Sequence, residues 1–437
     1  MTRSAFDTHH PPDPALVADC VHCGFCLPTC PTYMLWGKET DSPRGRIVLI
    51  KGGLAGETAI TDRLVRHFDT CLGCMACVTA CPSGVQYGKL IEATRPQIER
   101  QAHRALGDRL FRWLIFALFP YPTRLRLVAG KLWAYQRLGL QRLARATGLL
   151  RLLPAPLRAM EAVLPPVSLG GAWSTAPVRV PATGEQRRKV GMLLGCVQRV
   201  FFDKVNAATI RVLAAEGCEV VIPRTQGCCG ALMLHAGLEA DASDLARRFI
   251  DAFETEAADV DTIVINAAGC GSTLKEYGHL LRDDPVYADR AQALADKCKD
   301  ISELLAELEP RAPRHPVPLR VAYHDACHLQ HAQGVSAEPR LVLGTIPDLE
   351  VCEIPEAGIC CGSAGIYNLV ESDTADDLGD RKARHILTTS AEAVVSNNPG
   401  CLLQIASRLE HAGKPTRTLH MVELVDASIR DVRPGST

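Results

Sequence analysis

The sequence predicts a multidomain α+β protein, in which a helical N-terminal domain precedes a duplicated α/β domain with parallel sheets. Two cysteine runs of identical spacing lie within the first 81 residues. From Lys189 onward, strand-like and helical segments alternate, and four cysteines recur at a nearly constant offset. Such alternation is typical of parallel α/β layers. The length of 437 residues corresponds to about two or three domains, and we expect segments at 1–100, 101–187, 188–310 and 311–437.

Charge and hydropathy exclude several classes of protein. Lys and Arg total 48 and Asp and Glu total 49, so the positive excess of a nucleic-acid-binding protein is missing. The apolar run from Trp113 to Phe119 is far shorter than the roughly 18 residues that cross a bilayer. The segment from Met1 to His10 lacks the apolar core of a secretory signal. We therefore expect a cytoplasmic protein whose 19 cysteines stay reduced.

The N-terminal segment carries two C-x2-C-x2-C-x3-C-P runs. In each, three thiolates at three-residue steps on a tight loop can bind three corners of a cubane, and the fourth begins a helix leading to the other cluster. This is the signature of bacterial two-cluster ferredoxins. The runs predict one [4Fe–4S] cluster on Cys20, Cys23, Cys26 and Cys81, and a second on Cys71, Cys74, Cys77 and Cys30.

A pair of zinc sites is the alternative for these cysteines, since four thiolates also suit zinc. Zinc ribbons use paired C-x2-C knuckles, whereas each run here has three evenly spaced cysteines and a Cys-Pro, which favours iron–sulfur clusters. The 40 residues between the runs predict a helical connection from Ile47. Arg44 and Arg46 precede it, and we expect them either to contact a partner or shield cluster charge, or to lie in a solvated loop.

The stretch from Arg104 to Glu161 is basic and amphipathic. It holds 11 Lys and Arg but only two acidic residues, and large apolar side chains lie between the charges. This pattern predicts helices that either pack against the protein or a partner, which we favour, or lie on an anionic membrane surface. Prolines and a Gly170-Gly171 pair then predict a linker to about residue 187.

The C-terminal half is predicted to be a duplication. Cys196, Cys228, Cys229 and Cys270 are matched by Cys327, Cys360, Cys361 and Cys401, at offsets of 131 or 132 residues. Helices are expected at Asp203 to Glu216 and Ser243 to Glu256. Strands are expected at Val190 to Leu194, Glu219 to Ile222, Thr262 to Asn266, Arg320 to His324, Leu349 to Ile354 and Ala393 to Ser396.

The repeated cysteines follow strands, where ligands of open α/β sheets collect. Adjacent glycines would let the backbone approach a bulky inorganic group. Each repeat therefore offers four converging thiols, and we favour a further iron–sulfur centre over a redox-active dithiol or a zinc site. The second repeat also has His324, His328 and His331 around Cys327. The first repeat lacks them, so we expect these histidines to surround a centre rather than to ligate it.

The chain resembles a known family. The two ferredoxin runs and the paired Cys-Cys-Gly segments resemble iron–sulfur subunits of respiratory 2-hydroxyacid and glycerol-3-phosphate dehydrogenases and of heterodisulfide reductase. Within this group, the glycolate oxidase iron–sulfur subunit is the most similar in three motifs. These are Glu39-Thr-Asp-Ser-Pro-Arg-Gly-Arg46, His324-Asp-Ala-Cys-His328 and Asn398-Pro-Gly-Cys401-Leu-Leu-Gln-Ile405.

The resemblance implies an electron-transfer subunit of a bacterial oxidoreductase complex. Flavoprotein partners carrying FAD would oxidise glycolate to glyoxylate, and this subunit would pass the electrons to a membrane quinone from the inner face of the membrane. One departure concerns the end of each repeat. Heterodisulfide reductase domains have a Cys-x-x-Cys there, whereas residues 267 and 273, and 398 and 404, are not cysteines. The noncubane cluster of those proteins, and disulfide cleavage, are therefore in doubt.

The chain itself shows no motif for binding the hydride acceptor. There is no G-x-G-x-x-G after a strand and no G-x-x-x-x-G-K-[ST] loop, so we expect the flavin in a partner and no catalytic residue for substrate oxidation here. Three alternatives remain: a relay for lactate or glycerol-3-phosphate, a catalytic disulfide or quinone reductase acting through Cys360 and Cys361, and a zinc scaffold.

Overall fold

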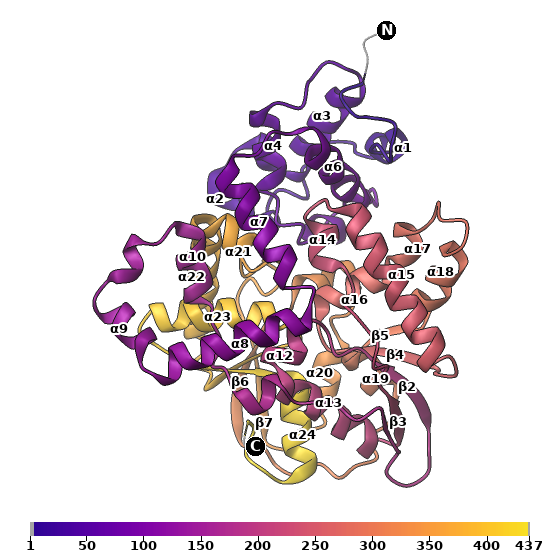
Figure 1. Cartoon of the computed structure of the whole chain (residues 1–437), viewed down its shortest axis with the longest axis vertical. Coiled ribbons are helices and arrows are strands. Elements are labelled where there is room, and N and C mark those ends of the chain that lie inside the picture. Colours follow the sequence, from indigo (N-terminus) through magenta and orange to yellow (C-terminus); the bar gives the residue numbers. More distant parts are fainter. Residues whose placement is uncertain (1–3, 436–437) are drawn as a thin grey trace.

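The computed structural model describes residues 4–435, and its N-terminal domain is a small helical unit (Figure 1). Proline begins α2 and α3, and the Ser42 hydroxyl caps α3 by accepting the Gly45 N–H. The core includes the fully buried Ile50, Phe68 and Leu90. The helices are α1 Pro14–Ala18, α2 Pro31–Trp36, η1 Glu39–Asp41, α3 Pro43–Leu54, α4 Asp62–Asp69, α5 Ala76–Thr79 and α6 Tyr87–Gln101.

The basic segment forms a set of helices that pack against both repeats. Ile115, Phe116, Leu125 and Ala129 are buried, which confirms that these helices pack against the rest of the protein. In Figure 1, α8 runs along α12 of the first repeat and α10 lies beside α22 of the second. The bounds are α7 Leu106–Leu118, α8 Pro122–Arg137, α9 Leu140–Ala146, η2 Leu149–Leu152, α10 Ala155–Ala162 and α11 Leu169–Ala172.

The first repeat is an α/β layer around a five-stranded sheet of order β1-β3-β2-β4-β5. All pairs are parallel except β1 with β3, which is antiparallel. The strands are β1 Arg179–Val180, β2 Arg188–Met192, β3 Cys218–Val221, β4 Thr262–Ile265 and β5 Cys298–Asp300. The helices are α12 Gln198–Phe201, α13 Asp203–Ala215, α14 Ala231–His235, α15 Glu239–Glu256, α16 Ala268–Lys275, α17 Tyr277–Leu280, α18 Ala288–Asp296 and α19 Ile301–Glu307.

The second repeat has the topology of the four parallel strands of the first, in a sheet of order β7-β6-β8-β9. Its strands are β6 Leu319–Tyr323, β7 Leu349–Glu353, β8 Ala393–Ser396 and β9 Arg417–His420. Its helices are the π-helical turn η3 His328–Ala332, α20 Glu338–Leu343, α21 Tyr367–Val370, α22 Ser372–Thr388, α23 Pro399–His411 and α24 Met421–Arg430. The predicted α+β class and the duplication are confirmed.

The two repeats pack against each other with pseudo-twofold symmetry. Helix α13 packs on α24, and the equivalent pair α19 and α20 also pack together. Buried residues of both sheets, such as Val190 and Val321, belong to one continuous core. Asn397 Nδ2 donates to Asp300 Oδ1 (3.0 Å), while His420 Nε2 lies 3.0 Å from the Asn266 carbonyl oxygen. Each repeat thus bonds to the residue that caps the last helix of the other.

Several sequence-based boundaries need correction. The helix expected from Ile47 begins at Pro43 and is preceded by the short helices α2 and η1, and the linker before residue 187 contains α11 and the edge strand β1. Only the first run ends directly in a helix: Cys30 precedes α2, whereas five residues separate Cys81 from the start of α6. The four segments 1–100, 101–187, 188–310 and 311–437 remain our proposed domains.

Candidate functional site

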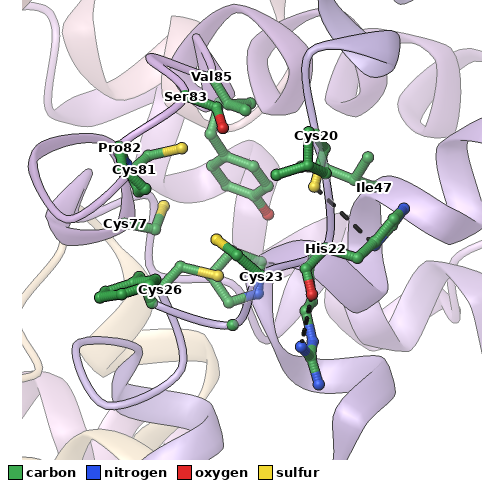
Figure 2. Close-up of a pocket in the computed structure, with 16 residues that line it drawn as sticks. Cys20, His22, Cys23, Cys26, Ile47, Cys77, Cys81, Pro82, Ser83 and Val85 are labelled. Carbon is green, nitrogen blue, oxygen red and sulfur yellow. Dashed lines mark hydrogen bonds between the residues drawn. The ribbon is translucent and has the colours of Figure 1, made fainter.

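The first cysteine cavity lies at the surface of the N-terminal domain. Cys20, Cys23, Cys26 and Cys81 line it together with Cys77. Figure 2 shows these side chains converging on the cavity from the two loops. Cys23 is exposed, and Cys20, Cys26 and Cys81 are half-buried. This is the first predicted ligand set, brought together from residues about 60 positions apart in the chain.

The two cysteine loops have the same backbone shape. His22 and Gly24 have φ values of 55° and 90°, and the equivalent Gly73 and Met75 have 63° and 59°. Left-handed residues on both sides of the central cysteine curl each loop around its cavity, so that neighbouring thiols face the same point. The Arg44 side chain braces the first loop by donating to the His22 carbonyl (2.9 Å), and it pairs with Glu39.

The second cysteine cavity is buried. Cys30, Cys71, Cys74 and Cys77, which are the second predicted ligand set, line it together with Arg46. All four thiols are buried, as is the Arg46 guanidinium, which is 1% exposed. Arg46 donates to the His67 carbonyl (2.6 Å) and to Thr32 and Thr70 hydroxyls. Of the two expectations for Arg46, the charge-shielding position fits and the solvated loop does not.

Arginine charge acts on the thiols of this second cavity. Burial would raise the pKa of Cys71, but Arg46 and Arg95 together bring it below its usual value. The pKa of Cys77 is raised by burial and by the surrounding thiols. The arginine charges favour the thiolate form of Cys71, and thiolate is the form in which cysteine binds a metal centre.

Cys77 lines both cavities. The two sites are therefore separated by little more than one side chain, with Tyr87 also facing both. Tyr87 Oη lies 3.6 Å from Cys71 Sγ. Tyr87 and Arg95 could not be predicted as neighbours of these cavities, because nothing in their local sequence pattern distinguishes them from other helical residues.

The first repeat gathers its four cysteines at the carboxyl end of its sheet. Cys196 follows β2, Cys228 and Cys229 lie in the loop before α14, and Cys270 is in the first turn of α16. Cys228 Sγ is 3.4 Å from Cys196 Sγ. The pKa of Cys229 lies well above its usual value. The neighbouring Cys228 thiol lowers it, but the Cys270 thiol and burial together raise it by more.

The second repeat gathers Cys327, Cys360, Cys361 and Cys401 in the same way, and all four are buried. Cys327 Sγ lies 3.9 Å from Cys360 Sγ, and Asn398 Nδ2 donates to Cys401 Sγ at 3.2 Å. The thiols thus converge in each repeat. Outside both groups, Cys218, Cys298 and Cys352 lie in strands β3, β5 and β7.

The glycine of each Cys-Cys-Gly segment is required by the backbone. Gly230 and Gly362 have φ values of 81° and 91°. A Cβ on Gly230 would lie 3.1 Å from the Ala242 carbonyl oxygen, and one on Gly362 only 2.5 Å from that of Ala375. The turn therefore brings the glycine itself close to the backbone of α15 or α22, where a side chain would not fit without movement.

The three histidines of the second repeat have different surroundings. His331 binds Thr79 Oγ1 (2.7 Å) and the Gly358 carbonyl (2.9 Å), and so joins the second repeat to the N-terminal domain. His328 Nδ1 lies 3.8 Å from Cys327 Sγ. His324 is buried, and a ring nitrogen lies within 4.8 Å of both Cys361 Sγ and Cys401 Sγ.

The N-terminal domain contacts the second repeat directly at its cysteines. Cys74 shares one buried apolar cluster with Cys327, Cys360 and Tyr367. Tyr367 Oη donates to the Thr70 carbonyl at 3.1 Å. The thiols of the second cavity and of the second repeat are therefore neighbours in the fold.

Comparison with known proteins agrees with this arrangement. The 4Fe-4S dicluster domain matches residues 16–85, the cysteine-rich domain matches residues 190–275 and 321–406, and the glycolate oxidase iron–sulfur subunit linker region matches residues 107–164. The chain is 42% identical to a probable glycolate oxidase iron–sulfur subunit of Bacillus subtilis, over 94% of both chains. It is 37% identical to the glycolate oxidase iron–sulfur subunit of Escherichia coli, over 95% of both.

The chain belongs to the glycolate oxidase iron–sulfur subunit family. A lactate utilization protein A of Geobacillus thermodenitrificans is more distant: it is 30% identical over 54% of this chain and 98% of its own length. As a member of this family, the chain is part of an oxidoreductase complex and carries iron–sulfur centres, with two [4Fe–4S] clusters in the dicluster domain. The buried, converging thiols fit such groups.

Proposed function

We propose that this glycolate oxidase iron–sulfur subunit carries electrons from a flavoprotein that oxidises glycolate to glyoxylate to a membrane quinone. The relatives that match nearly its whole length are named for glycolate oxidase. The ligands of the two [4Fe–4S] clusters are the two sets that line the two cavities. The Cys-Cys-Gly thiols hold further iron–sulfur centres, and the flavin belongs to the partner.

One observation carries the relay: three thiol sites lie side by side from the surface to the interior. The exposed first cavity shares Cys77 with the buried second cavity. The second cavity in turn meets the second repeat where Cys74 packs near Cys327. Iron–sulfur centres exchange one electron at a time, so adjacent centres suit stepwise transfer.

The balance of the reaction requires such a relay. Glycolate loses two electrons and two protons on becoming glyoxylate, and a flavin takes the electrons as a pair. A quinone gains two electrons and two protons on becoming quinol. The chain's residues therefore have to provide a one-electron path, and proton donors only where the acceptor binds.

The flavoprotein is proposed to dock at the first cavity. Val21 and Phe25, which flank Cys23, are 68% and 66% exposed. Exposed apolar side chains beside an exposed ligand are suited to a partner interface. Docking there would bring the flavin close to the first cluster and cover these side chains.

The acceptor is proposed to bind in a cavity between α6, α14 and α16. The cavity is lined by Met75, Glu92, His235, Thr273, Glu276 and His328. Met75 follows Cys74, and His328 follows Cys327, so both neighbouring centres are close. Burial raises the pKa of Glu276, which suits a group that holds a proton for the acceptor. Exchange of Glu276 for Gln should slow quinone-analogue reduction without changing reduction of the chain by its partner.

Peripheral membrane contact is proposed for α7. Leu106, Leu110 and Trp113 lie on one helical face and are 65–80% exposed, and Arg109 lies beside them. Among the described residues, no helix could span a membrane. We expect the chain to float with anionic vesicles and Trp113→Asp to abolish this, whereas Trp173→Asp, which changes another exposed Trp, should not. Flotation that Trp113→Asp leaves unaltered would contradict the assignment.

The substrate is tested on the complex purified anaerobically with its flavoprotein subunits. Glycolate should bleach the iron–sulfur absorption within the turnover time, whereas lactate and glycerol-3-phosphate should not. Bleaching by lactate or glycerol-3-phosphate instead would assign the chain to a sibling relay. Cys74→Ser should block electron flow beyond the first cluster, and the matched Cys352→Ser, outside the thiol sites, should leave it unchanged.

A further inference from the structure

The two Cys-Cys-Gly repeats differ at one structurally equivalent position next to their thiols. Leu193 and His324 are each the first residue after the equivalent strands β2 and β6. The Leu193 N–H donates to the Val264 carbonyl (3.0 Å), and the His324 N–H donates to the equivalent Val395 carbonyl (2.8 Å). The backbone is therefore the same, and the difference lies in the side chain.

His324 is buried without an ordinary hydrogen-bonding partner. His324 is only 1% exposed. Among the described residues, neither of its ring nitrogens has a hydrogen-bond partner of proper geometry. Burying unpaired polar nitrogens costs free energy. The other buried histidine of this repeat, His420, satisfies both nitrogens, with the Asn266 carbonyl and the Val422 N–H.

The position of His324 supplies the missing partner. A ring nitrogen of His324 and the sulfurs of Cys361 and Cys401 all lie within 4.8 Å of one another. Imidazole nitrogen and thiolate sulfur are both ligands of iron and zinc. A metal held by the two cysteines would be within reach of the imidazole after small side-chain adjustments.

We propose that His324 is a ligand of the metal centre in the second repeat, and that this centre is a multinuclear iron–sulfur centre with one nitrogen ligand. Together with Cys327, Cys360, Cys361 and Cys401 it makes five donors. A tetrahedral zinc ion takes four, whereas a centre with several irons has room for five. The first repeat, with Leu193, has only its four thiols.

The nitrogen ligand makes the two repeats electronically different. A neutral imidazole at this position gives the centre less negative charge, and so a higher reduction potential, than a fifth thiolate would, as in Rieske centres. The second repeat also lies beside the buried ferredoxin-type cavity. A higher potential there draws electrons out of the N-terminal domain. Only this consequence rests on the proposed relay; the ligation itself does not depend on the substrate or the acceptor.

The test uses the full chain, purified anaerobically with ¹⁵N-labelled histidine and examined by pulsed EPR in the dithionite-reduced and oxidised states. The spectral component lost in Cys361→Ala identifies the centre of the second repeat. We expect this component to show a directly bonded histidine nitrogen in the unaltered chain. The same coupling should persist in His331→Gln, whose histidine lies in the same segment but binds Thr79 and Gly358.

Two variants complete the test. His324→Leu reproduces the first repeat and should abolish the nitrogen coupling. His324→Cys should keep the iron, abolish the coupling and shift the midpoint potential to a more negative value. An assigned component without nitrogen coupling in the unaltered chain, or coupling that survives in His324→Leu, would overturn the proposal. So would zinc in place of iron at the site lost in Cys361→Ala. Glycolate plays no part in these measurements, so a wrong substrate would leave them unaffected.

Discussion

The two Cys-Cys-Gly repeats share a scaffold but not the chemistry around it. The order of the four parallel strands, the four cysteines and the left-handed glycine are the same in both. The side chains next to the thiols differ: Leu193 and Ala267 in the first repeat correspond to His324 and Asn398 in the second. The second repeat also packs its thiols near Cys74. Both copies thus keep the features that gather the thiols, and the neighbouring side chains differ in the copy whose thiols lie beside Cys74 of the ferredoxin-type domain.

The largest difference between the repeats should appear when each loses one thiol. Cys361→Ala and Cys229→Ala should each remove the iron of its own repeat. Only Cys361→Ala should slow the transfer of electrons out of the N-terminal domain. Iron per chain and the reoxidation rate of the dithionite-reduced chain by a quinone analogue measure this. Equal slowing by both variants would mean that the first repeat also lies on the path.

A smaller difference should follow from adding a methyl group at each Cys-Cys-Gly turn. A left-handed alanine costs about 1–2 kcal/mol. Gly362→Ala adds a severe contact with the Ala375 carbonyl, whereas Gly230→Ala adds a milder one with the Ala242 carbonyl. We expect losses of about 2–4 kcal/mol for Gly362→Ala and about half that for Gly230→Ala. Thermal unfolding checks the order, with Gly227→Ala as control because its Cβ meets nothing within 4 Å.

The crossed helix caps should give opposite pH dependences. Burial raises the pKa of Asp300 to about 6, so the folded state holds the extra proton and this contribution to stability is lost as pH rises from about 4 to 6. Burial lowers the pKa of His420 to about 4, so this contribution is present above pH 6.5 and is lost as pH falls towards 4. In the unaltered chain the two oppose each other.

Asp300→Asn removes one of these two contributions. The unfolding temperature should then fall steadily from pH 6.5 to 4.5, by an amount corresponding to about 2–3 kcal/mol. Thermal scans of the variant and the unaltered chain at matched pH values measure it. A variant whose profile parallels that of the unaltered chain would show that Asp300 does not hold its proton.

The smallest expected effect concerns Asn398, which has no counterpart in the first repeat. Asn398→Ala removes the N–H donated to Cys401 Sγ, which should cost about 0.5–1.5 kcal/mol and make the potential of the second centre more negative. Asn368→Ala is the control, since Asn368 donates to Gln404 rather than to a thiol. A potential shift of the same size in both variants would exclude a specific role for this bond.

Sequence reasoning found most of this architecture because the cysteine spacing and the strand runs are local signals. The six predicted strands are present, each within two residues of its expected ends. It missed β5 and β9 because Cys298–Asp300 and Arg417–His420 are short and carry charged residues, so no apolar run marks them. It also missed β1, a two-residue strand inside the expected linker.

The histidines show what spacing cannot provide. His324, His328 and His331 look equivalent around Cys327 in the sequence, but His331 binds Thr79, a residue 252 positions away, while His324 lies beside Cys361 and Cys401. Likewise, Arg46 became a buried neighbour of the second cavity only through its bonds to His67 and Thr70. Such roles depend on contacts between distant segments, which no single window of sequence contains.

The crossed bonds between Asn266 and His420 and between Asn397 and Asp300 have an evolutionary consequence. In one repeat alone, each of these residues would lack its hydrogen-bond partner, and a second copy of the same repeat would supply both partners. The present chain thus has the architecture of a homodimer whose two subunits have been joined in one polypeptide. In a dimer encoded once, every substitution occurs twice. After the joining, a histidine could be gained in one half while leucine remained in the other.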